Sequence, residues 1–160
     1  MKTFVWFVIW TALASGCATD SRTVAAHDEY VEHAARYKLL AAQPGPKSWR
    51  ADASWTFTLL NKKGAIVNSL DFQVTAEPAN TCSSGEWKKL RVVRQSTLMT
   101  HNPAYSIEGR NLQILLSTAL CDSYDELSGE LDEHGFVGVH RFSGMRGGEE
   151  YGKVLGSPTH

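Results

Sequence analysis

Two histidines, His134 and His140, have the side-chain type and spacing best suited to proton transfer. The carboxylates near them in the sequence are Asp122, Asp125, Glu130 and Glu133. A histidine held beside a carboxylate acts as a general acid or base, so a hydrolase that uses His134 or His140 is one hypothesis. The alternative places these residues in turns and on the solvated face of a sheet. We favour the alternative and predict a non-enzymatic protein with no catalytic residue.

Other patterns that identify common reactions are absent from the sequence. Ser84 and Ser143 each precede a glycine, but neither lies in the Gly-x-Ser-x-Gly turn that exposes a hydrolase nucleophile. No glycine-rich loop with Lys and Ser or Thr is present to hold a phosphate. We therefore predict no cofactor and no metal site.

Cys82 and Cys121 form an even pair once the N-terminal cysteine is set aside. In an oxidising compartment such a pair usually forms a disulfide. Closing a chain loop of this length removes roughly 4 kcal/mol of denatured-state entropy in the chain-entropy model. A thiol or metal site is the alternative, but there is no Cys-x-x-Cys and no histidine at ligand spacing. We predict a structural disulfide.

Aromatic residues are spread through the chain beyond residue 54 and either line a ligand cavity or fill a core. They are Trp55, Phe57, Phe72, Trp87, Tyr105, Tyr124, Phe136, Phe142 and Tyr151. Trp55, Trp87 and Tyr124 are our candidates for ligand contact if the domain holds a small apolar molecule. A dry core is the default interpretation, because small barrels hold one small ligand or only side chains.

The scaffold that must position these residues is predicted to be a β-sheet. Apolar and polar residues alternate over 54–59 and again over 69–74, with a turn at 61–64 between them. Such alternation, broken by turn residues, is typical of antiparallel hairpins with one buried face. Further strands are expected at 87–98, 105–108, 112–120, 124–131, 136–142 and 149–155.

Glycine is frequent near the C-terminus, with eight glycines from Gly129 to Gly156. Glycines allow the bends by which a small sheet closes on itself. We predict a mainly β fold, namely a small antiparallel meander barrel of about eight strands, with a two-sheet sandwich as the alternative. In architecture this pattern resembles the small lipocalin-like and avidin-like barrels.

A helix is expected before the sheet, from about residue 18 to 42, because Val31, Ala34 and Tyr37 belong to a loose apolar stripe. Pro44 and Pro46 break it. We divide the chain into a signal at 1–16, a tether and helix at 17–46 and a β domain at 47–160.

Cys17 ends a segment with the layout of a secretory signal. Lys2 is followed by an apolar stretch at 4–14 and by the small residues Ser15 and Gly16. The stretch is shorter than the roughly 20 residues that a membrane-spanning helix needs. A cysteine in this place resembles the lipobox of bacterial lipoproteins. An ordinary secretory signal, with Cys17 free or paired, is the alternative.

The resemblance implies that Cys17 is lipidated, that the signal is removed before it, and that the new amino terminus is acylated. Three acyl chains anchor firmly, because each buried CH₂ contributes about 0.8 kcal/mol. In enterobacterial lipoproteins, Asp after the cysteine retains the protein in the inner membrane, and Ala18 stands there instead. We therefore expect the outer membrane, facing the periplasm, with a soluble periplasmic protein as the alternative.

Composition narrows the class of partner. The formal net charge is −1 and the basic residues form no cluster, so the chain has no long-range attraction for nucleic acid. The leading functional hypothesis is a lipid-anchored, disulfide-stapled β domain that binds an envelope protein or component. The alternatives are a carrier of a small apolar ligand and the hydrolase described above.

Overall fold

The computed structural model describes residues 21–95, 98, 100–145 and 147–159, with side chains from residue 31 onward. Cys17 and the predicted signal lie outside these residues. The elements are α1 (Ser21–Ala41), β1 (Ser54–Leu60), β2 (Ile66–Pro78), β3 (Lys88–Gln95), β4 (Ala104–Glu108), β5 (Asn111–Leu115), β6 (Ser123–Leu131), β7 (Phe136–Gly144) and β8 (Gly147–Thr159). The compact unit that contains the barrel begins at Ala35, within the predicted helix.

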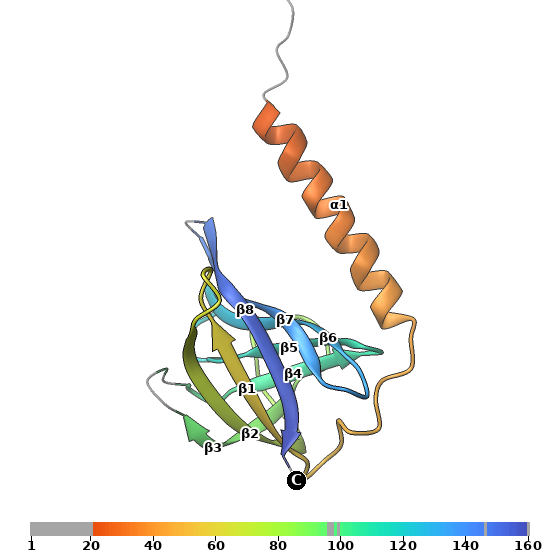
Figure 1. Ribbon diagram of the computed structural model, residues 1–160, viewed down its shortest axis with the longest axis vertical. Coiled ribbons are helices and arrows are strands. Elements are labelled where there is room, and N and C mark those ends of the chain that lie inside the picture. The colour runs from red at the N-terminus through yellow and green to blue at the C-terminus, as the bar shows by residue number, and fades with distance from the viewer. Residues whose placement is uncertain (1–20, 96–97, 99, 146, 160) are drawn as a thin grey trace, which may run out of the picture. The chain divides into compact units, whose positions relative to one another are not determined.

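The eight strands form a closed barrel in chain order, and β8 pairs back onto β1 (Figure 1). Each strand is antiparallel to both of its neighbours. The prediction of a meander barrel is thus confirmed, and the sandwich is excluded.

The barrel interior is lined by the apolar side chains that alternate along the strands. On β1, Trp55, Phe57 and Leu59 are at most 1% exposed, and the residues between them are only half-buried. The same cluster takes in Trp49, Leu70, Phe72, Val74, Leu90, Tyr105, Leu112, Ile114, Leu116, Leu127, Leu131, Phe136 and Val154. Interiors packed in this way have few voids larger than a water molecule.

Glycine brings β6 and β7 close together, as expected for a small barrel. Gly129 and Gly138 lie opposite each other in the ladder. A Cβ atom on Gly129 would lie 2.3 Å from the carbonyl oxygen of Val137, and one on Gly138 would lie 2.5 Å from the Phe136 ring. The Phe136 ring therefore takes space inside the barrel that a larger residue at 138 would occupy.

Two strands are shorter than predicted. β3 ends at Gln95 and not at residue 98, where Leu98 leaves the strand and packs against the core. β5 ends at Leu115 and not at residue 120, because its ladder with β6 stops at the pair Leu115–Glu126. The chain then turns toward Cys121.

Cys82 and Cys121 form the predicted disulfide, with their Cα atoms 5.1 Å apart. It joins the β2–β3 connection to the β5–β6 connection and so encloses β3, β4 and β5. Within that loop lies the shortest ladder of the barrel, since β3 and β4 share only the pairs Lys88–Tyr105 and Lys89–Ala104 among the described residues. The disulfide therefore spans the weakest seam of the sheet.

Candidate functional site

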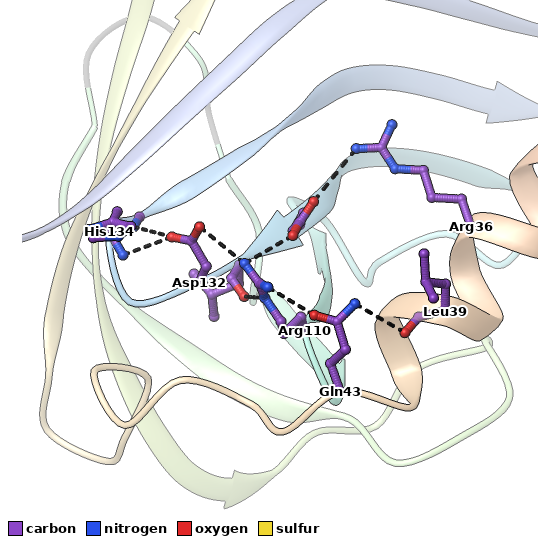
Figure 2. A network of polar contacts seen from close by, with 9 residues as sticks. Arg36, Leu39, Gln43, Arg110, Asp132 and His134 are labelled. Atoms are coloured by element: carbon purple, nitrogen blue, oxygen red, sulfur yellow. Dashed lines mark hydrogen bonds and ion pairs between the residues drawn. The ribbon is translucent and has the colours of Figure 1, made fainter.

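A network of polar side chains lies where the β6–β7 turn meets the β4–β5 turn (Figure 2). We call it the turn surface. Its members are Gln43, Arg110, Glu130, Asp132, Glu133, His134, Val137 and Leu155.

Asp132 organises the β6–β7 turn. Its Oδ1 accepts hydrogen bonds from the backbone N–H of His134 at 2.7 Å and of Gly135 at 3.0 Å. Its backbone N–H donates to the Gly135 carbonyl at 2.9 Å. The pKa of the Asp132 carboxyl is lowered, chiefly by the His134 N–H, then by the Gly135 N–H and the nearby positive charges. Asp132 is therefore ionised under ordinary conditions, and its hydrogen bonds close the turn.

Arg110, in the β4–β5 turn, binds two carboxylates at once. Its Nη2 lies 2.9 Å from Glu130 Oε1 and 3.0 Å from Asp132 Oδ2. Its Nη1 donates to Gln43 Oε1 at 2.8 Å, as Figure 2 shows. The guanidinium is thus occupied by protein groups. Arg110 holds the two turns together and is not available as a free anion-binding group.

The C-terminal end of α1 is fixed to the same turn. The Arg110 backbone N–H donates to the Leu40 carbonyl at 2.9 Å. Gly109 has a φ of 57°, and a Cβ atom there would lie 2.5 Å from the carbonyl oxygens of Leu40 and Ala41. Only glycine permits this approach. The Tyr37 hydroxyl adds a hydrogen bond to Glu108 Oε2 at 2.6 Å.

Two shallow grooves open on the turn surface, and Asp132 and His134 line both. One, of about 340 Å³, also contacts Pro44 and Pro46. The other, of about 320 Å³, runs past Val137 and Leu155. These two residues face each other across the β7–β8 ladder and are 59% and 46% exposed. An exposed apolar pair beside rigid, charged turns is a combination suited to contact with another protein.

The structure separates the two candidate histidines. His134 lies on the turn surface, while His140 lies further along β7, opposite Leu127 of β6. His140 is 8% exposed, and its Nε2 lies 2.6 Å from Asp125 Oδ1. The Tyr151 ring packs on it, with ring centroids 4.9 Å apart. A histidine–carboxylate pair therefore exists, but His134, Glu130 and Glu133 are not part of it, and the hydrolase hypothesis stays a prediction.

The three candidates for ligand contact lie in two places. Trp55 is 0% exposed inside the barrel. Trp87 belongs to a separate cluster with Ala104 and Leu115, against which Tyr124 packs. The indole N–H of Trp87 donates to the Ser84 carbonyl at 2.9 Å. The three side chains therefore do not line one common cavity.

Arg110 and Gln43 were not among the candidate residues predicted from the sequence. A single arginine in a turn gives no signal of its own. Its importance comes from Gln43, 67 residues away along the chain, and from the two carboxylates of the next hairpin.

Within the described residues, no helix is long and apolar enough to cross a membrane. No three or more His, Cys, Asp or Glu side chains in that part of the chain are placed to hold a metal ion. Comparisons with protein-family models, with curated proteins and with solved structures find no match to this chain.

Proposed function

We propose that the protein is a lipid-anchored lipoprotein of the bacterial cell envelope, and that its barrel binds another envelope protein through the turn surface without catalysing a reaction. Cys17 would carry the anchor, and the barrel would face the periplasm from the outer membrane. The disulfide Cys82–Cys121 supports an oxidising compartment.

One observation carries the proposal: the turn surface offers two grooves and an exposed apolar pair, whereas the side chains that face the barrel interior form one buried apolar cluster. A carrier of an apolar ligand needs an enclosed space of several hundred Å³. A protein-binding module needs only a rigid outer surface. The grooves are lined by three carboxylates, Glu130, Asp132 and Glu133, and by one arginine, Arg110. A partner with apolar and basic side chains is therefore the best complement.

The anchor is tested by Cys17→Ser. In the host, the unaltered chain should take up labelled fatty acid and sediment with the outer membrane, and the variant should take up none and be released. Val93→Ser is the control, because Val93 is 62% exposed and the change leaves both the proposed anchor and the disulfide intact. Labelling that survives Cys17→Ser would contradict this part of the proposal.

The binding surface is tested by site-specific photocrosslinking in living cells. A photoreactive residue at Val137 or Leu155 should give the same single protein adduct. The matched control is Val93 on β3, which is 62% exposed and lies outside the turn surface. Equal adducts from all three positions, or none from Val137 and Leu155, would contradict the proposal.

The hydrolase remains a second candidate, favoured by the 2.6 Å contact of His140 with Asp125. It predicts that any hydrolytic activity of the purified chain is lost in His140→Ala and kept in His134→Ala. An activity that both variants retain would eliminate it.

A further inference from the structure

Trp55 carries a buried hydrogen-bond donor with no acceptor in the described part of the chain. Its side chain is 0% exposed, and its Nε1 has no hydrogen-bond partner. Its cross-strand neighbours, Phe72 and Pro158, bring no side-chain acceptor. Leaving such a donor unpaired costs about 1–3 kcal/mol, and buried polar groups in proteins are nearly always paired. The unpaired N–H therefore needs an explanation.

Other polar atoms gather around the same place. The Trp49 ring lies 5.2 Å from the Trp55 ring and 5.3 Å from the Tyr105 ring, measured between centroids. Tyr105 donates its hydroxyl proton to the Thr75 carbonyl at 2.8 Å and keeps oxygen lone pairs free to accept. We call this group, Trp49, Trp55 and Tyr105, the indole cluster.

The indole N–H of Trp49 differs from that of Trp55 in what it faces. Its Nε1 makes no hydrogen bond of good geometry, but it faces the Tyr105 hydroxyl. Burial raises the pKa of Tyr105, and the facing indole of Trp49 opposes part of that rise. The Trp49 N–H thus has a partial acceptor, whereas the Trp55 N–H has none.

We propose that the indole cluster binds an uncharged guest whose oxygen atom accepts a hydrogen bond from Trp55 Nε1. The guest is uncharged, because the surrounding core is apolar and an unpaired ion there would be very unfavourable. The guest is small, because the site lies within the buried apolar cluster of the barrel. A buried water, which typically makes two to four hydrogen bonds, and a small organic molecule with a carbonyl or hydroxyl group share this chemistry. This site is separate from the turn surface and does not depend on the proposed function.

The proposal is tested by NMR on the whole mature chain with ¹⁵N-labelled tryptophan. The indole resonances are assigned with Trp49→Phe, Trp55→Phe and Trp87→Phe, and by elimination if Trp55→Phe does not fold. Bulk water is the probe. A bound water should give cross-relaxation between the Trp55 indole proton and water. Trp87 is the internal control, because its N–H already donates to Ser84.

Native mass spectrometry of the same chain, with a denatured control, separates the two sources of the oxygen. A water cross-peak with an unchanged mass supports a structural water. An adduct that is lost on denaturation and in Trp55→Phe supports a small organic guest and gives its mass. If the native mass is that of the chain alone and the Trp55 proton shows no water cross-peak, the proposal is overturned, and the N–H then faces an aromatic ring.

Discussion

At the scale of single residues, Asp132 illustrates how backbone groups set the charge of a turn. The N–H groups of His134 and Gly135 point at its carboxylate and stabilise the ionised form. They would do so without any other charge nearby. Arg110 then adds its positive charge to a carboxylate that is already ionised.

We predict that Asp132→Asn lowers stability at neutral pH and that the loss disappears in acid. The pKa of Asp132 is lowered from its ordinary value of 3.8 in the folded state. Its contribution is therefore fully present above 3.8 and is lost as the pH falls through the lower folded value. Urea unfolding of both chains from pH 7 to pH 2 measures the difference. A difference that is constant across this range would contradict the prediction.

Tyr37 gives the opposite pH dependence. Its hydrogen bond to Glu108, burial and the Glu108 charge raise its pKa to about 12. Its contribution is fully present below the ordinary value of 10.0 and is lost as the pH rises through about 12. A tyrosinate absorbance titration should lose its step near 12 in Tyr37→Phe. In Glu108→Gln, which keeps an acceptor but no charge, the step should move toward 10.

At the scale of elements, the fit of the helix end onto the β4–β5 turn depends on one glycine. Gly109→Ala should destabilise the protein by more than the roughly 1–2 kcal/mol cost of a left-handed backbone alone, because its Cβ meets the Leu40 carbonyl at 2.5 Å. The matched control is Gly64→Ala. Gly64 has a φ of 81° with no atom within 4 Å of an added Cβ. Equal losses of unfolding free energy for the two variants would refute the close fit.

The seam between β3 and β4 should depend on the disulfide. In the double variant Cys82→Ser, Cys121→Ser, the unfolded chain regains the conformational entropy that the closed loop had removed. The free energy of unfolding should therefore fall by roughly 4 kcal/mol. Amide hydrogen exchange should show the largest loss of protection on β3 and β4, because their ladder has only two pairs in the described residues. Protection lost evenly over all strands would show that the disulfide acts only by lowering the entropy of the unfolded chain. In that case it would not hold β3 and β4 together locally.

The strands were predictable because the burial signal is local. The alternation of Trp55, Phe57 and Leu59 with polar residues is visible in five consecutive positions, and β1 follows it. Strand ends were less predictable, since the ladder of β5 with β6 ends at the pair Leu115–Glu126, although apolar residues continue to Leu116 and beyond. The Arg110 network was not predictable, because its partners are brought together only by the closure of the barrel.

At the scale of the whole molecule, the residues that stabilise the barrel are different from those of the proposed binding surface. The interior cluster unites residues from every strand, so each strand depends on the others for its buried face. The turn surface is built from hairpin ends and outward-facing residues, which take no part in that cluster. A change on one should therefore leave the other intact.

This separation yields the last prediction. Leu127→Ala, at a position 0% exposed inside the barrel, should lower the free energy of unfolding by about 2–5 kcal/mol, because the packed neighbours cannot fill the space. Val137→Ser, on the neighbouring strand but 59% exposed, should change it by less than about 0.5 kcal/mol. The same change should remove the adduct formed by a photoreactive residue at Leu155. Urea unfolding and crosslinking on the same two variants provide the measurement. If Leu127→Ala costs little, the interior is not closely packed, and a ligand-carrying barrel becomes the better account of the fold.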